Sequence, residues 1–300
     1  MTKPREEADP SAKQQAGAVG VPAGYRRTLA GSVEFEGKGI HTGEHCRVRV
    51  HPGREGLVLW ANGVSAPVSA EHAVELERRS ALQVGETRIN TCEHLLSALF
   101  GLEIDSAVVE VDGPEVPILD GSALPFVEAF EEVGIQCLDE PRRLYQPARP
   151  VWVSEGNAVL AALPPSGLHG LALTVRFVLT GSHPTLSGQS ACYIHNPGAF
   201  RQEIAPARTW CIREQVEQLL AGGLALGGDL DNTLVVDERG YSSALRVPDE
   251  PVRHKVLDLL GDIALLGVPL AADLVAVGSG HRLNIRLVRS LLASGLASAD

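Results

Sequence analysis

Residues Arg253–Asp262, with the sequence RHKVLDLLGD, show the clearest structural pattern in the chain. Upstream, Pro251 stands where the first turn of a helix would begin, and downstream Gly267 would end that helix. Leucine, valine and isoleucine cover nearly every direction around the helical stretch between them. The sequence therefore predicts a helix over residues 251–266 that is buried and has one narrow polar stripe.

The polar stripe of this predicted helix consists of His254, Asp258 and Asp262, which are spaced four residues apart and share one face. Imidazole and carboxylate groups suit zinc, which in a catalytic site has three protein ligands and a water molecule. A helical His-x3-Asp pair would then need a third ligand from elsewhere in the chain. Alternatively, His254 caps the core and the aspartates form a hydrated edge, and the spacing is compatible with both interpretations.

Length and composition limit the class of protein. The 300 residues, of which 44% are hydrophobic, suffice for two domains or for one large domain with a sizeable core. The net charge of −11 argues against a nucleic-acid-binding protein. Five scattered cysteines without a C-x-x-C pair favour reduced thiols in a cytoplasmic protein over a thiolate metal site. Neither a transmembrane segment nor a secretory signal is expected from the apolar runs of the sequence.

The order of the expected elements is typical of the α+β class. Residues 1–24 are polar and show no periodicity, so we expect a disordered tail there. A first α+β domain is expected over residues 25–139, in the order strands, helix, strand, helix. Residues 140–150 are rich in charges and proline and are expected to form a linker. The second half, residues 151–300, repeats the order of elements and is expected to be a second α+β domain.

The missing metal ligand has a candidate in His94, near the start of a helix expected over residues 91–100. Its neighbour Glu93 is a candidate general base, because a carboxylate beside a metal site can take the proton of an attacking water molecule. Alternatively, Asn90 and Glu93 form a capping box that only stabilises the helix end.

A further histidine, His281, follows two glycines in an expected turn before a last helix that starts at Asn284. Beside a metal site this imidazole could protonate a leaving amine. Asp262, one helical turn beyond Asp258, could then orient the imidazole and raise its pKa. Alternatively, His281 is an incidental loop histidine.

Six motifs follow one another in register along the chain. They are Gly39–Gly43, Thr91–Leu99, Pro114–Ser122, Ala207–Thr209, His254–Asp258 and Ser279–His281. Over about residues 25–293 the chain resembles the UDP-3-O-acyl-N-acetylglucosamine deacetylases, the zinc amidases of lipid A biosynthesis. The resemblance implies two similar domains, each a β-sheet packed on a helix pair, with the helices facing each other across the domain interface. It also implies an insert in the second domain that forms an apolar passage for the acyl chain.

The resemblance also implies roles for individual positions. The positions that match the zinc ligands, for which iron(II) is the alternative ion, are His94, His254 and Asp258. Glu93 matches the general base, and His281 matches the acid or charge-stabilising histidine. Asp262 matches the partner that orients this histidine, and Thr209 matches the hydroxyl that helps to hold the oxyanion.

Other matched positions concern the substrate. Lys255 matches a lysine on the polar side of the substrate, and the positions that match the acyl passage are Val216, Ala225 and Leu230. The sequence departs from the family at Trp210, where Phe is usual, and at Arg213, where an apolar lining residue is usual. Because a buried unpaired arginine is costly, we expect Arg213 to point outward or to meet a carboxylate.

The expected activity is hydrolysis of the N-acetyl group of UDP-3-O-acyl-N-acetylglucosamine by a monomer, with release of acetate, as the committed step of lipid A biosynthesis. One alternative is a related zinc amidase that acts on another N-acetylated sugar nucleotide, an interpretation that only Arg213 favours. The other is a non-catalytic sugar-nucleotide-binding relative, which would have lost metal ligands or the base. The sequence retains all of these groups.

Overall fold

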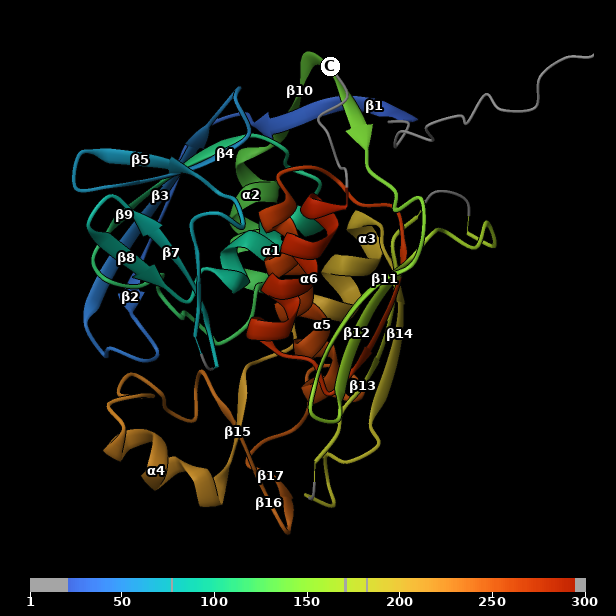
Figure 1. The fold of residues 1–300 in the computed structure, drawn as a ribbon. Helices are drawn as coiled ribbons and strands as arrows, with labels where there is room; N and C mark the ends of the chain where they lie inside the picture. The colour runs from blue at the N-terminus through green and yellow to red at the C-terminus, as the bar shows by residue number, and fades with distance from the viewer. Residues whose placement is uncertain (1–20, 77, 170–171, 182, 295–300) are drawn as a thin grey trace, which may run out of the picture.

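The computed structural model describes residues 21–76, 78–169, 172–181 and 183–294. These residues form six α-helices and several β-sheets, which confirms the α+β class. The helices α1 (Glu93–Gly101), α5 (Glu250–Ile263) and α6 (His281–Ala293) lie at the centre, between strands of the first half and strands of the second half (Figure 1). Among the helices of the described residues, none is both long and apolar enough to span a membrane.

The first half contains a five-stranded sheet on one side of the central helices. Its strands are β2 (Val33–Lys38), β3 (His45–Pro52), β4 (Leu57–Ala61), β5 (Val64–Pro67) and β9 (Ala107–Asp112). Their spatial order is β2-β3-β9-β4-β5, with β9 antiparallel to β3 and parallel to β4. Alternate residues of the strands, such as Val48 and Val50, are fully buried. This sheet face packs in the core with α1 and with α2 (Leu124–Val133).

The second half contains a five-stranded sheet with the same topology. Its strands are β11 (Val151–Glu155), β12 (Ala158–Leu163), β13 (Thr174–Val178), β14 (Ser190–Ile194) and β18 (Asp273–Val277). Their spatial order is β11-β12-β18-β13-β14, with β18 antiparallel to β12 and parallel to β13. In both sheets the last strand of the chain order is inserted between the second and the third.

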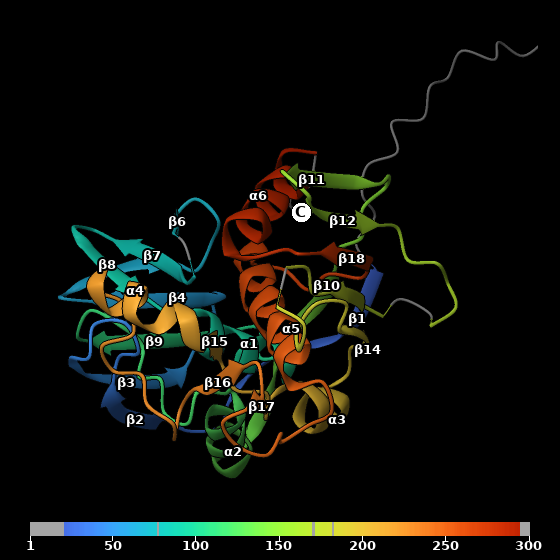
Figure 2. The ribbon, with the colours of Figure 1, turned by 90° about the horizontal axis from the view of Figure 1, so that it is seen from below.

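Two three-stranded sheets complete the surroundings of the central helices. One consists of β6 (Ala73–Glu75), β7 (Ser80–Val84) and β8 (Thr87–Asn90), and the other of β15 (Trp210–Ile212), β16 (Leu234–Asp237) and β17 (Gly240–Tyr241). After β15, a 3-10 turn (Arg213–Gln215) leads into α4 (Val216–Ala221). The sheet of β15, β16 and β17 lies with α4 at the lower end of Figure 1, and Figure 2 views the molecule from that end. Before them, α3 (Pro197–Ala199) continues into a π-helical turn (Phe200–Ile204).

The expected tail and linker both need correction, because each contributes residues to a strand. The strands β1 (Val21–Leu29) and β10 (Ile135–Leu144) pair in antiparallel orientation. Residues 21–24 of the expected tail and residues 140–144 of the expected linker therefore belong to a two-stranded sheet, while residues 1–20 lie outside the described part. The pairing joins segments far apart in the sequence, so local composition gave no sign of it.

One hydrophobic cluster extends through both halves of the protein. It contains Leu95 and Leu99 of α1 together with Leu257 and Leu260 of α5, all of which are at most 1% exposed. The predicted helix over 251–266 is present as α5 followed by a 3-10 turn (Ala264–Leu266). The core thus places α1 directly beside α5.

Candidate metal centre and active site

The polar stripe of α5 lies inside the protein. His254, Asp258 and Asp262 are 2%, 3% and 0% exposed, respectively. The Nδ1 atom of His254 lies 3.0 Å from the carbonyl oxygen of Ala207. A carbonyl oxygen can only accept, so Nδ1 carries the proton, and Nε2 is left with a lone pair that can bind a metal.

The start of α1 is fixed by contacts outside the helix. Thr91 adopts a left-handed backbone conformation (φ 55°), and its hydroxyl donates to the buried carboxylate of Glu115 at 2.5 Å. The capping box considered for Asn90 and Glu93 does not form, because no side chain caps this helix. Instead, the carboxylate of Glu93 accepts a hydrogen bond from the backbone N–H of Ser80 at 3.1 Å. The first turn of α1 therefore presents its side chains to the site.

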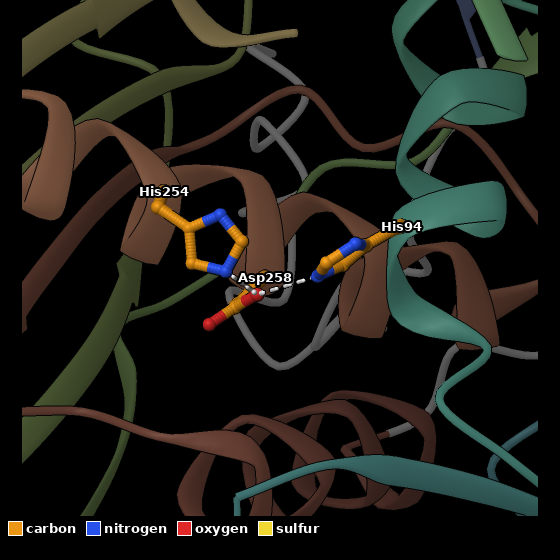
Figure 3. A group of neighbouring side chains, drawn as sticks. All are labelled: His94, His254 and Asp258. Atoms are coloured by element: carbon orange, nitrogen blue, oxygen red, sulfur yellow. Dashed lines mark ion pairs between the residues drawn. The ribbon is translucent and has the colours of Figure 1, made fainter. Parts of the chain in front are cut away.

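His94 of α1 meets His254 and Asp258 of α5 (Figure 3). The Nε2 atoms of His254 and His94 lie 3.3 and 3.9 Å from Asp258 Oδ1. One ligand atom from each of the three side chains lies within 4.8 Å of the other two. Metal bonds of about 2.0–2.1 Å in tetrahedral geometry place ligand atoms roughly 3.3 Å apart. This donor set therefore fits a single divalent ion, with His94 moving slightly inward.

The protonation states of the three side chains also suit a metal ion. Burial, with a smaller contribution from the neighbouring His254, lowers the pKa of His94 to about 3. Burial likewise lowers the pKa of His254. Burial alone would raise the pKa of Asp258, but electrostatic interactions with His254, Lys255 and His281 outweigh burial and hold this pKa well below its usual range. At neutral pH the group therefore offers two neutral imidazoles and one carboxylate, the forms that bind metals.

Lys255 fixes the second oxygen of the metal-binding carboxylate. Its Nζ donates to Asp258 Oδ2 at 2.7 Å and lies 5.7 Å from the centre of the Trp210 ring. The indole Nε1 of Trp210 donates in turn to the carbonyl oxygen of Pro251 at 3.0 Å. Asp258 therefore keeps Oδ1 toward the two histidines while Oδ2 is neutralised by the ammonium group.

Glu93 and His281 form a second pair beside the metal-binding group. Glu93 Oε1 and His281 Nε2 lie 3.7 Å apart, and both side chains are buried. Burial raises the pKa of Glu93 to about 8, although the charge of His281 opposes this rise. Burial would lower the pKa of His281, but the charges of Asp262, Glu93 and Asp258 raise it to about 9. Both pKa values therefore lie within about two units of neutral pH, a range suited to general acid–base catalysis.

His281 is the first residue of α6, whereas the sequence led us to expect a turn there and a helix only from Asn284. The backbone N–H of Asn284 donates to the carbonyl oxygen of Gly280 at 2.9 Å and closes the first helical turn. The helix starts at His281 because Gly280 has an extended backbone and is therefore the N-cap residue of α6. This geometry directs the imidazole of His281 toward Asp262.

Asp262 is fully buried and accepts hydrogen bonds from three side chains. Its Oδ2 accepts from His281 Nδ1 at 2.9 Å and from Asn284 Nδ2 at 2.8 Å, and its Oδ1 accepts from the Ser80 hydroxyl. The sequence interpretation missed Asn284 and Ser80. Asn284 stands three residues after His281, a spacing that places both on one helical face, but Ser80 carried no signal in the sequence.

A cavity of about 500 Å³ connects this site with apolar side chains of the second half. Its polar lining includes Glu93, His94, His254, Asp258 and His281, and its apolar lining includes Val216, Ala225, Leu230, Leu219 and Val235. Leu230 is 63% exposed, so the cavity is open to solvent near this residue. The three positions expected to line a passage thus line the same cavity as the metal-binding group.

Thr209 lines this cavity, whereas Arg213 does not belong to the residues that line it. The backbone N–H of Thr209 donates to the carbonyl oxygen of Gly121 at 2.7 Å, which fixes the strand β15 beside the first half. Arg213 pairs with Asp237 at 3.0 Å, with its side chain 58% exposed. The expectation that this arginine points outward or meets a carboxylate is therefore correct on both counts.

Comparisons with known proteins agree with this geometry. The family model described as UDP-3-O-acyl N-acetylglycosamine deacetylase matches residues 26–293. A UDP-3-O-acyl-N-acetylglucosamine deacetylase of Anaeromyxobacter dehalogenans is 40% identical over 278 residues, which cover 91% of this chain and 89% of the relative. Proteins of the same name from Leptospira biflexa and Chlamydia felis are each 37% identical, covering 90% and 89% of this chain and 90% and 96% of the relatives. The chain, with its buried histidine–aspartate group, belongs to the UDP-3-O-acyl N-acetylglycosamine deacetylase family.

Proposed function

We propose that this protein is a zinc-dependent deacetylase. It hydrolyses the N-acetyl group of UDP-3-O-acyl-N-acetylglucosamine and releases acetate, the committed step of lipid A biosynthesis. One observation carries the proposal: a metal-binding group, a buried carboxyl and a buried imidazole share one cavity with apolar side chains. Membership of the family supports the choice of substrate.

His94, His254 and Asp258 would hold the ion, with one ligand from the first half and two from the second. The absence of cysteine from this group favours a catalytic over a structural zinc site. When bound, zinc would polarise the amide carbonyl and lower the pKa of a water molecule and of the nearby carboxyl. Iron(II) is the alternative ion, because imidazole and carboxylate ligands suit it as well.

The chain's own groups then perform the proton transfers. Glu93 takes a proton from the attacking water molecule, whose oxygen forms a bond to the carbonyl carbon of the acetamide. His281, held by Asp262, stabilises the negative charge and donates a proton to the nitrogen as the C–N bond breaks. The hydroxyl of Thr209 donates to the oxyanion, which lowers the free energy of the tetrahedral state. The products are acetate and a free amine on the sugar.

The substrate would occupy the cavity with its acyl chain along the apolar lining. Val216, Ala225 and Leu230 offer contacts that remove apolar surface from water, about 0.8 kcal/mol for each buried CH₂ group. Lys255, whose ammonium group lies at the metal-binding carboxylate, would contact the polar side of the substrate. The position of Arg213 outside the cavity lining removes the one feature that favoured a different sugar nucleotide.

We also propose that the chain forms two similar domains that bury their helices against each other. The shared topology of the two five-stranded sheets supports this division, with α1 and α2 in the first domain and α5 and α6 in the second. Residues 21–144, which include the paired strands β1 and β10, would belong to the first domain and residues 151–294 to the second, with residues 210–241 as the insert that forms the passage. We propose a monomer, because the site is formed within one chain. We propose a cytoplasmic location, because the five scattered cysteines favour reduced thiols.

Acetate release from the acylated substrate, measured with and without a chelator, tests the proposed function. We expect release by the zinc-loaded protein, loss after chelation and recovery when zinc is added back. UDP-N-acetylglucosamine without the acyl chain should be a much poorer substrate. Equal rates on both compounds would favour a different sugar nucleotide, and no release in any condition would favour a non-catalytic binding protein.

A further inference from the structure

Ser80 occupies an unusual place at the interface between the two halves of the site. It is the first residue of β7 and is 2% exposed. Its backbone N–H donates to Glu93 Oε2 at 3.1 Å. Its hydroxyl donates to Asp262 Oδ1 and lies 3.1 Å from His281 Nδ1. One residue thus touches the proposed base, the proposed acid and the carboxylate that orients the acid.

The direction of each hydrogen bond follows from the groups involved. Asp262 Oδ1 accepts from the Ser80 hydroxyl, which thereby uses its single proton. The hydroxyl oxygen is then free to accept from the Nδ1–H of His281, which also donates to Asp262 Oδ2 at 2.9 Å. Ser80, Asp262 and His281 therefore form a closed triangle that leaves His281 Nε2 facing Glu93.

The contacts of Ser80 also cross the interface between the halves. Glu93 belongs to the first half of the chain, whereas Asp262 and His281 belong to the second. The backbone N–H of Ser80 binds Glu93, while its hydroxyl group contacts Asp262 and His281. A displacement of about 1 Å between reacting groups can cost on the order of 100-fold in rate. A single residue bound to both sides limits such a displacement.

We propose that Ser80 is a positioning residue, which fixes the Glu93 carboxyl and the Asp262–His281 pair in one relative arrangement. The inference rests on the proposed function, because it assigns Ser80 a part in the same reaction. Ser80 is not among the residues that line the cavity, so it acts through its neighbours and not on the substrate.

The first test compares kcat and KM for acetate release by Ser80→Ala and by the zinc-loaded wild type. The alanine variant keeps the backbone N–H to Glu93 but removes the donor to Asp262 Oδ1. We expect kcat to fall roughly 10- to 100-fold while KM changes less than about twofold, because only the arrangement of the reacting groups is disturbed. Ser80→Thr keeps the hydroxyl and should recover most of the lost kcat.

A matched control is Ser97→Ala, which removes another buried serine hydroxyl. Ser97 lies on α1 and is 0% exposed, and its hydroxyl has no hydrogen-bond partner among the described residues. We expect its kcat to equal that of the wild type. Thermal unfolding and zinc content are measured for every variant, so that a folding or metal defect is recognised as such.

A readout that does not depend on activity is the proton NMR signal of the His281 Nδ1–H group. This signal is identified by its absence in His281→Gln. We expect Ser80→Ala to shift it and Ser97→Ala to leave it in place, because the Ser80 oxygen shares this proton with Asp262.

The outcomes separate this inference from the proposed function. If the wild type releases acetate and Ser80→Ala retains its kcat within about twofold, the positioning role is wrong while the deacetylase assignment stands. If alanine and threonine variants lose kcat equally and both unfold at lower temperature, Ser80 has only a structural role and the inference is overturned. If the wild type releases no acetate, the proposed function fails, and an unshifted His281 signal in Ser80→Ala would then overturn the inference separately.

Discussion

Gly261 of α5 lies directly against the backbone of Glu93 on α1: a Cβ atom at Gly261 would stand 2.2 Å from the Glu93 carbonyl oxygen. Real Cβ atoms do not approach an oxygen this closely, so the two helices can meet here only because residue 261 has no side chain. The same contact sets the distance between His94 on α1 and Asp258 on α5. The metal-binding group therefore depends on a glycine that carries no functional group.

Replacing this glycine should weaken both the fold and the metal site. In Gly261→Ala the added methyl group must push α1 and α5 apart, and overpacking of this kind costs about 1–3 kcal/mol. We expect a lower melting temperature and weaker zinc binding, measured by thermal unfolding and by competition with a chelator. Gly222→Ala is the control, because its Cβ would be no closer than 3.4 Å to other atoms. Equal zinc affinity in both variants would contradict the role of Gly261.

Glu93→Gln should retain zinc and lose most of its turnover. The amide keeps the shape of the side chain and an oxygen for the Ser80 N–H, but it cannot take a proton from water. We expect kcat to fall on the order of 100-fold or more, as for the loss of a general base. Glu132→Gln, at an exposed position of α2, should behave as the wild type. Turnover equal to that of the wild type would remove Glu93 from its proposed role.

His254→Ala should lose the metal. The variant removes one of three ligands and leaves Asp258 beside Lys255 without its nearest imidazole. We expect less than stoichiometric zinc by elemental analysis after dialysis, together with loss of acetate release. His45→Ala serves as the comparison, because this histidine is largely exposed and pairs with Glu36 on the surface. Unchanged zinc content in His254→Ala would exclude the proposed ligand set.

The pH dependence of stability should change in Glu250→Gln. This residue begins α5, and its buried carboxylate accepts from Arg208 Nε at 2.8 Å and from the Arg246 N–H at 2.8 Å. Burial would raise the pKa of Glu250, but the hydrogen bonds from these arginines outweigh burial and lower it. A lowered pKa in the folded state means that the ionised form stabilises the protein above the usual glutamate pKa. This stability is lost as the pH falls through the folded-state value.

Breaking a buried ion pair of this kind costs about 3–5 kcal/mol at neutral pH. We therefore expect the difference in melting temperature between the wild type and Glu250→Gln to be large at pH 7 and to shrink as the pH falls below the usual glutamate range. Glu131→Gln is the control, because its partner Arg201 is exposed and such pairs contribute at most about 1 kcal/mol. A difference in melting temperature that is the same at every pH would contradict the assigned pKa shift.

The local sequence pattern was sufficient to predict α5 and its buried polar stripe. Apolar residues occupy nearly every direction around this helix, and such a pattern predicts a helix that is buried in the core. The pairing of His94 with that stripe was proposed from ligand chemistry and supported by the family resemblance. The spacing of residues within one helix could not establish this pairing, because His94 and Asp258 lie on different helices far apart in the sequence. Helical geometry placed Glu93 and His94 about 100° apart, and both reach the site because they lie in the first turn of α1.

Features that depend on distant partners were not predictable in the same way. The first four residues of β1 and the last five of β10 lie in the expected tail and linker, because charges and prolines such as Pro22 and Pro141 are uncommon in regular strands. Ser80 is a small residue at the start of a short strand, and its contact with Asp262 spans 182 positions of the chain. A single serine forms no periodic pattern in the sequence, so its contact with Asp262 can be recognised only in the three-dimensional structure.

Side chains from the two halves of the chain are proposed to bind one divalent ion. Anomalous diffraction from crystals of the zinc-loaded protein, recorded on both sides of the zinc absorption edge, would locate this ion. We predict one strong peak at about 2.0–2.2 Å from His94 Nε2, His254 Nε2 and an oxygen of Asp258. A zinc peak at another place, or no peak among these three side chains in protein that contains zinc, would exclude this shared metal site.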